Sequence, residues 1–185
     1  MTDLTQRYDI LLDSAELSHY DTVTERWLLD LAGYFHDTDA YERLSTTTNP
    51  LLYKVYGTTR PTLPGELISG ITQLYPGKVG DEYFMTKGHF HAVLETAEVY
   101  YCLRGTGLLV LESPEGDTKI EPFAAGRVVQ IPPRWAHRTV NTGDEELIFF
   151  WVCPANAGHD YGTIVERGFR QRVIDRSGES VVVEQ

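Results

Sequence analysis

Most of the chain beyond residue 50 alternates between short runs of strand-forming residues and turns rich in Gly, Pro, Asn and Asp. Turn sequences such as YPGKVG, SPEGD and PANAGHD separate the runs. Many short strands at this spacing are typical of an antiparallel sandwich or barrel, so we predict an all-β fold. The clearest strand candidates are residues 51–59, 67–75, 99–105, 108–113, 127–132, 147–153 and 180–184.

The beginning of the chain differs from the rest because residues 1–35 show no clean period. Within residues 37–44, Asp37 is an N-cap candidate and apolar residues follow at helical spacing up to Leu44, which predicts one short helix. We expect residues 1–50 to be an N-terminal extension packed on a barrel of residues 51–185. The whole chain then forms a single structural domain, as its length of 185 residues allows.

Composition excludes several classes of function. A net charge of −11 argues against nucleic-acid binding, which needs a basic surface. No run approaches the about 20 apolar residues of a membrane span, and the N-terminus has no apolar signal segment. We therefore expect a soluble, cytoplasmic protein without membrane partners. Cys102 and Cys153 lie in apolar strand candidates and are predicted to be buried, reduced thiols.

Two histidines, His89 and His91, stand one residue apart in TKGHFH. On a strand they would point the same way, about 6.5–7 Å apart, and both imidazoles could reach one divalent ion. Taken alone, such a pair is equally consistent with a polar strand face. A third histidine, His137, follows a strand candidate and a Pro-Pro turn in RVVQIPPRWAHRTVN.

The spacing around these histidines carries more information than the pair. From His89 to Gly105 it is H-x-H-x6-E-x6-G, and from Gly126 to Asn141 it is G-x5-P-x4-H-x3-N. The two patterns resemble the two half-motifs of the cupin superfamily. This resemblance implies a double-stranded β-helix, a small antiparallel barrel whose mouth holds a metal on three histidines and one glutamate. The implied ligands are His89, His91, Glu98 and His137.

Two glutamates compete for the fourth ligand position. Most cupins place the acid three or four residues after the second histidine, which would select Glu95. The acid also normally begins a strand six residues before a glycine, and only Glu98 has that relation to Gly105. We therefore predict Glu98 as the ligand and Glu95 as a solvated loop residue. Arg134 stands where most cupins have a turn glycine, which reshapes the turn before His137.

Between about residues 74 and 170 the chain resembles the cupin-type phosphoglucose isomerases, best known from archaea. The likeness rests on LYPGKVGDEYFMTKGHFHAVLETAEVYYCLRGTG, PPRWAHRTVNTGDE and PANAGHDYGTIVERGF. It implies interconversion of glucose 6-phosphate and fructose 6-phosphate by a metal-dependent homodimer. It also implies substrate contacts from Tyr53, Thr72, Thr86, Lys87, Gly88, Tyr100, His159 and Tyr161. Cys153 departs from the family pattern, which has a tyrosine there and gains one hydrogen bond from it.

Aldose–ketose exchange moves a hydrogen between C1 and C2 of the open-chain sugar. Proton transfer needs a base, for which Glu98 is the candidate, and a divalent ion that stabilises developing negative charge. A hydride shift is the other route, and the sequence does not separate the two. For the phosphate, Thr86 offers a hydroxyl, Lys87 a charge and Gly88 an approachable backbone N–H.

Three other functions share parts of this pattern. A cupin dioxygenase would use the same ligands with redox-active iron, and an epimerase-type cupin would use a His–Asp base without metal. A non-catalytic sugar-binding cupin would lack at least one ligand, whereas all four are present. A three-histidine, one-glutamate site accommodates Fe²⁺, Mn²⁺, Ni²⁺, Co²⁺ or Zn²⁺, so the sequence leaves the metal open.

Overall fold

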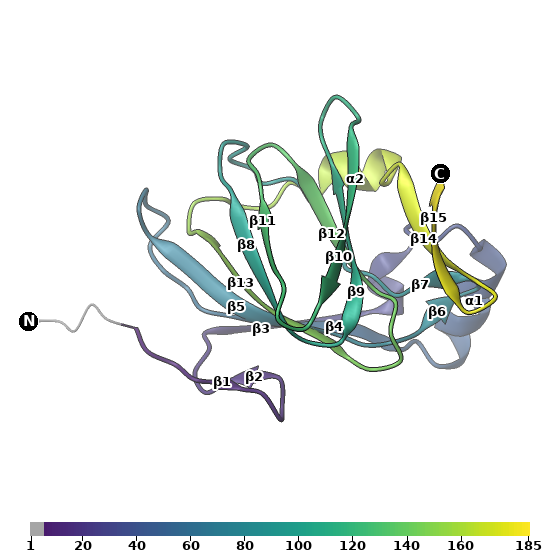
Figure 1. The fold of residues 1–185 in the computed structure, drawn as a ribbon, viewed down its shortest axis with the longest axis horizontal. Helices are drawn as coiled ribbons and strands as arrows, with labels where there is room; N and C mark the ends of the chain where they lie inside the picture. The colour runs from purple at the N-terminus through teal and green to yellow at the C-terminus, as the bar shows by residue number, and fades with distance from the viewer. Residues whose placement is uncertain (1–5) are drawn as a thin grey trace, which may run out of the picture.

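A computed structural model describes residues 6–185 and shows two facing antiparallel sheets with two short α-helices (Figure 1). The larger sheet has the order β11-β8-β13-β5-β4-β3 and the smaller facing sheet β10-β9-β12. The larger sheet contains β3 (Thr22–Trp27), β4 (Leu51–Gly57), β5 (Leu67–Leu74), β8 (Glu98–Arg104), β11 (Val128–Ile131) and β13 (Leu147–Pro154). The smaller one contains β9 (Thr106–Glu112), β10 (Thr118–Ala124) and β12 (Ala136–Asn141).

The predicted all-β cupin fold is confirmed, and each of the seven strand candidates corresponds to a strand. Among the described residues the strands form separate sheets, without the continuous hydrogen-bonded ring of a closed barrel. β10 was not predicted because it contains Pro122 and, before it, the charged residues Lys119 and Glu121. That proline is tolerated because β10 is an outer strand of its sheet.

Aromatic side chains join the two sheets in one core. Phe123 on β10 lies 5.6 Å from Phe149 on β13, and Tyr100 on β8 lies 4.8 Å from Phe149 (ring centroids). Phe123 and Phe149 are almost completely buried. Burying a side chain of this size contributes about 1.5–3 kcal/mol, so these aromatic residues stabilise the packing of the two sheets.

The segment before residue 51 supplies a strand as well as a helix. β3 pairs antiparallel with β4 and forms the outer strand of the large sheet. A 3₁₀-helix (Leu28–Leu31) follows it, and Leu28 and Leu31 are fully buried in the main core. Helix α1 (Thr38–Thr47) begins after Asp37, whose side chain accepts from the backbone N–H of Ala40 at 2.8 Å, as the N-cap prediction required.

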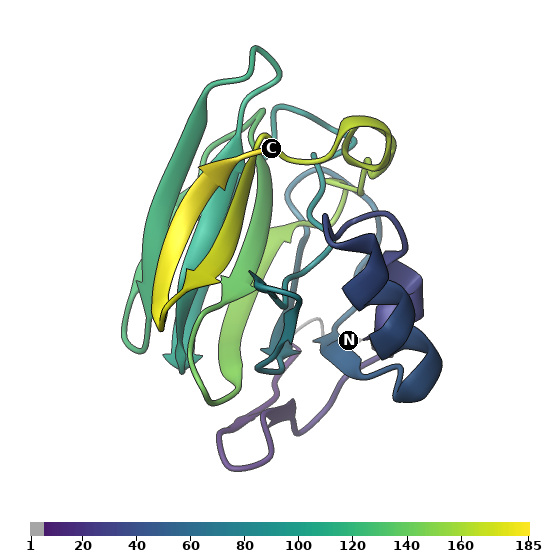
Figure 2. The ribbon, with the colours of Figure 1, turned by 90° about the vertical axis from the view of Figure 1, so that its right-hand side faces the viewer.

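Short elements complete the described chain. A hairpin of β1 (Ile10–Leu11) and β2 (Glu16–Leu17) precedes β3. A four-stranded sheet in the order β15-β14-β7-β6 comprises β6 (Lys78–Val79), β7 (Glu82–Tyr83), β14 (Gln171–Arg176) and β15 (Glu179–Glu184). Helix α2 (Gly162–Arg167) leads into β14. Figure 2 shows the β14-β15 hairpin beside the strands of the smaller facing sheet and α1 at the opposite side. None of the described helices has the length and apolarity needed to cross a membrane.

Candidate metal centre and active site

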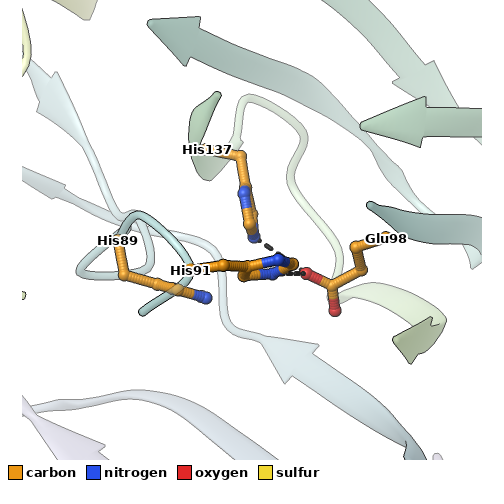
Figure 3. A group of neighbouring side chains, drawn as sticks. All are labelled: His89, His91, Glu98 and His137. Atoms are coloured by element: carbon orange, nitrogen blue, oxygen red, sulfur yellow. Dashed lines mark hydrogen bonds and ion pairs between the residues drawn. The ribbon is translucent and has the colours of Figure 1, made fainter. Parts of the chain in front are cut away.

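Four side chains converge near the start of β8 (Figure 3). Each of them offers one ligand atom, and these atoms all lie within 4.8 Å of one another: His89, His91, Glu98 and His137. Glu98 is the first residue of β8 and His137 the second residue of β12, so the two facing sheets contribute one ligand each. The structure thus brings together the four residues that the cupin spacing selected.

The segment that carries His89 and His91 is held by single bridges and is not a regular strand. His89 pairs with His137 through reciprocal backbone hydrogen bonds, at 3.3 Å from His89 N–H and 3.1 Å from His137 N–H. The rings of His89 and His91 lie 5.7 Å apart and both face the cluster. The predicted strand is therefore only partly formed, yet the two imidazoles share one side of it.

Backbone and hydroxyl groups orient two of the imidazoles. Nδ1 of His91 lies 2.8 Å from the hydroxyl oxygen of Thr96, and Nδ1 of His137 lies 3.4 Å from the carbonyl oxygen of Trp135. With Nδ1 occupied in this way, Nε2 of each ring turns to Glu98. The distances to Oε2 of Glu98 are 3.2 Å from His91 and 3.0 Å from His137.

The cluster has the donor set and the spacing of a divalent-metal site. Nε2 of His137 is buried and has no hydrogen-bond partner of good geometry within the described residues, although it lies 3.0 Å from Oε2 of Glu98. Neighbouring ligands bound at about 2.1 Å at right angles are about 3 Å apart, the separation found between Glu98 and the two rings. The residues present therefore fit a divalent metal ion.

The charge state of the cluster also suits a cation. Burial alone would raise the pKa of Glu98, but its close contacts with His137 and His91 outweigh burial and lower that pKa to about 2. Burial, and then the neighbouring histidines, lower the pKa of His89 well below its ordinary value. At neutral pH the cluster therefore presents a carboxylate and a neutral His89, the forms in which these groups bind metals.

Glu95 lies outside the cluster. Its side chain is largely exposed and pairs with Arg134 at 3.0 Å. Arg134 has a positive φ of 71° and its backbone N–H donates to the carbonyl oxygen of Leu94 at 2.7 Å. The residue that replaces the usual turn glycine thus keeps a left-handed conformation and ties the turn before His137 to the loop of Glu95.

Three of the predicted substrate residues border the cluster directly. His159 lies 4.4 Å from His89 and stacks on Tyr161, with ring centroids 5.6 Å apart. Tyr100 is buried, and its ring lies 5.6 Å from that of His137. Burial, followed by the charge of Glu98, raises the pKa of Tyr100 well above its ordinary value, so its phenol stays protonated and can donate.

The other predicted substrate residues lie on neighbouring strands and the loop before His89. The hydroxyl of Tyr53 accepts from the backbone N–H of Lys87 at 3.4 Å, and Thr72 is buried on β5. Thr86 accepts from the backbone N–H of Thr139 at 3.1 Å, which leaves its own hydroxyl proton free to donate.

Gly88 has a positive φ of 72°, and a Cβ there would lie 2.5 Å from the ring of Phe169. Only glycine fits this position, because the backbone passes close to Phe169 and Arg138. Cys153 and Cys102 are both buried and free, and burial, then the charge of Glu98, raises the pKa of the Cys153 thiol. Cys153 therefore stays a neutral thiol.

Sequence reasoning missed two residues that organise the site. Thr96 contacts His91, and Arg138 is almost completely buried, with its guanidinium 4.4 Å from the ring centroid of Phe169. Arg138 also donates to the carbonyl oxygen of Lys87 at 2.9 Å, which fixes the backbone next to Gly88. The only signal in the sequence was their position beside metal ligands: Thr96 lies two residues before Glu98, and Arg138 follows His137.

An all-β fold with three histidines and one glutamate converging at the end of its strands defines a metal-binding protein of the cupin class. The model of the glucose-6-phosphate isomerase (GPI) family matches residues 25–185, and the chain belongs to this family.

Relatives named glucose-6-phosphate isomerase support this assignment. Those of Pyrococcus furiosus and Thermococcus onnurineus are 52% and 51% identical over 159 residues, which is 86% of this chain and 84% of each relative. The protein of that name from Thermococcus litoralis is 46% identical over 157 residues. Among solved structures, a deletion mutant of Bacillus subtilis oxalate decarboxylase is similar to this chain, with 22% sequence identity and a TM-score of 0.48. The alignment covers 61% of this chain and 28% of the decarboxylase chain.

Proposed function

We propose that this protein interconverts glucose 6-phosphate and fructose 6-phosphate with one divalent metal ion per chain. The observation that carries the proposal is the cluster of four ligand atoms within 4.8 Å in a chain of the glucose-6-phosphate isomerase family. His89, His91, Glu98 and His137 would hold the ion. Bound there, it would act as a Lewis acid toward the oxygens on C1 and C2 of the open-chain sugar.

Glu98 is proposed as the base that moves a proton between C1 and C2. Oε2 of Glu98 faces the rings of His91 and His137, whereas Figure 3 shows its other carboxylate oxygen turned away from them. Its low pKa, about 2, keeps Glu98 ionised and able to accept a proton at neutral pH. A positioned base contributes about 10²–10⁴-fold to the rate.

The sugar would lie between the metal ligands and the inner face of the large sheet. The Tyr100 phenol and the His159 and Tyr161 pair border the ligands, and they are proposed to donate to or accept from sugar hydroxyls. Tyr53 and Thr72 come from adjacent strands of the same sheet and are proposed to line the pocket farther from the ligands.

The phosphate is proposed to bind at the loop just before His89. The ammonium of Lys87, the free hydroxyl proton of Thr86 and the backbone N–H of Gly88 would donate to phosphate oxygens. Burial, then the charge of Arg26, lowers the pKa of Lys87, but lysine begins from a high ordinary value, which favours a charged ammonium at neutral pH.

We further propose a cytoplasmic homodimer that works in glycolysis and gluconeogenesis, with iron (Fe²⁺) as one of the candidate ions beside Mn²⁺, Ni²⁺, Co²⁺ and Zn²⁺. Val23 and Trp27 on the outer strand β3 are exposed apolar side chains, which supports pairing through this edge. Light scattering tests the dimer, and elemental analysis of protein purified without added metal tests the ion.

The substrate assignment is tested by comparing kcat/KM for fructose 6-phosphate and fructose. Two or three charge-assisted hydrogen bonds to the phosphate, each about 1.5–3 kcal/mol, imply a preference of about a thousandfold or more. Lys87→Ala should lose part of the preference and keep its metal. Equal kcat/KM values would contradict the assignment, and oxygen consumption with an organic substrate would indicate a dioxygenase instead.

A further inference from the structure

Arg26 lies on the inner face of the large sheet, which is also the face of the pocket. In the register of β3 and β4 it stands directly opposite Tyr53. Side chains of directly opposed residues in an antiparallel pair point to the same face. Tyr53 is buried in the main core, and Thr72 lies on the same face through the register of β4 with β5. The side chain of Arg26 therefore leaves the strand on the face of the pocket, and its Nη1 donates to the backbone carbonyl oxygen of Glu25 at 3.3 Å.

Arg26 and Lys87 approach the same group of phenols. The backbone N–H of Lys87 contacts the Tyr53 hydroxyl at 3.4 Å, and its ammonium lies 5.9 Å from the ring centroid of Tyr34. After burial, the positive charge of Arg26 is the next cause that lowers the pKa of Lys87, and the same charge acts on Tyr53 and Tyr161. Arg26 and Lys87 thus both adjoin Tyr53, and a third cation, Arg138, lies 5.6 Å from the ring centroid of Tyr34.

No carboxylate neutralises this pair at close range. Within residues 6–185, neither Arg26 nor Lys87 has a carboxylate oxygen within 4.0 Å, and Asp30 acts on Lys87 only from farther away. The whole chain carries a net charge of −11, so two cations without a carboxylate within 4.0 Å form a locally positive region in an acidic protein. An anion between them would remove their mutual repulsion and gain charge-assisted hydrogen bonds.

We propose that Arg26 is the second cation, with Lys87, of the subsite for the 6-phosphate and that it helps set the preference for phosphorylated sugars. The proposal rests on the proposed function and extends it to a residue of the N-terminal segment. A guanidinium can contact two phosphate oxygens at once, and the phenols of Tyr34, Tyr53 and Tyr161 offer further donors.

The test is steady-state kinetics of Arg26→Gln with Lys54→Gln as the matched control. Lys54 stands next to Tyr53 on β4 but on the outer face, where it pairs with Glu25 at 2.9 Å, so its loss changes the net charge equally. Arg26→Gln should raise KM for fructose 6-phosphate about tenfold or more and leave kcat/KM for fructose unchanged, because one charge-assisted contact is lost. The inhibition constant of inorganic phosphate should rise by a similar factor.

Arg26→Lys should lie between the parent and Arg26→Gln, and Lys54→Gln should match the parent. The midpoint of thermal unfolding shows whether each variant is folded, and its metal content shows whether the metal site is occupied. If Arg26→Gln keeps the parent's preference for fructose 6-phosphate, or loses activity toward both sugars equally, Arg26 is not part of the phosphate subsite. If the parent itself has no preference, the proposed function fails instead, so the two failures are distinguishable.

Discussion

The hydroxyl oxygen of Thr96 lies 2.8 Å from Nδ1 of His91 and 2.6 Å from the carbonyl oxygen of Val93. A threonine hydroxyl has one proton, and Thr96 donates it to Val93, so its oxygen accepts from Nδ1–H of His91. This contact favours the tautomer of His91 whose Nε2 carries a lone pair, and Nε2 faces the other ligand atoms of the cluster. Partners of this kind orient metal-binding imidazoles.

Replacing Thr96 by Val should therefore weaken metal binding without removing a ligand. We expect metal affinity to fall toward the lower end of about 10–100-fold in Thr96→Val, because Nδ1 of His91 loses the hydroxyl at 2.8 Å and keeps only the backbone carbonyl oxygen of residue 96 at 3.1 Å. Thr96→Ser keeps the hydroxyl and should bind nearly as well as the parent. Competition with a chromogenic chelator measures both affinities, and equal binding by Thr96→Val and the parent would show that the Thr96 hydroxyl has no orienting role.

The two glutamates near His91 should respond very differently to amide substitution. Glu98→Gln removes a charged ligand and the proposed base, so we expect a loss of several orders of magnitude in kcat. Glu95→Gln removes only half of an exposed ion pair with Arg134, worth at most about 1 kcal/mol, and should stay within a few-fold of the parent. Steady-state kinetics measures both, and a reversed order would refute the choice of Glu98.

The stability of the metal-free protein should depend on pH through His89. Its pKa is depressed in the folded protein, so below its ordinary value of 6.5 the unfolded chain binds a proton that the folded chain does not. The free energy of unfolding should therefore fall as the pH drops from about 7 to about 5.5. In His89→Gln this contribution is absent, and urea unfolding should show a shallower pH dependence. The same slope in both proteins would contradict the burial of a neutral His89.

Two motif glycines provide a matched test of the fold. Gly105 and Gly126 both have positive φ, +85° and +86°, but a Cβ at Gly105 would lie 2.5 Å from the carbonyl oxygen of Glu146, whereas nothing lies within 4 Å at Gly126. Gly126→Ala should cost about 1–2 kcal/mol from backbone conformation alone. Gly105→Ala should cost more, because the backbone of Glu146 must also shift. Urea unfolding of both variants checks this order, and equal costs would show that the close approach at Gly105 is not a constraint.

How far the sequence predicted the structure can be seen from individual elements. The strand at Leu147–Pro154 was predicted nearly to its ends because it is a continuous apolar run. β12 was missed because His137, Arg138 and Thr139 are polar although they are buried. In this strand the polar residues serve the site, so the usual apolar pattern of a buried strand is absent.

The candidate site also contains residues that the sequence predicted and residues that it did not. The four ligands were found because their spacing along the chain forms a motif. Arg26 was not found, because its place in the pocket depends on the pairing of β3 with β4, more than twenty residues later in the chain. Thr96 was not found either, because a loop hydroxyl reveals its partner only in three dimensions. Long-range register and loop geometry are the parts that local sequence patterns do not encode.

The most direct test of the central claim is the rate of conversion of glucose 6-phosphate to fructose 6-phosphate as a function of bound metal. Protein stripped with a chelator and then titrated with Mn²⁺ or Fe²⁺ should recover activity in proportion to metal content, up to about one ion per chain. Stripped protein should be inactive. Full activity in protein that elemental analysis shows to be free of metal would contradict the account.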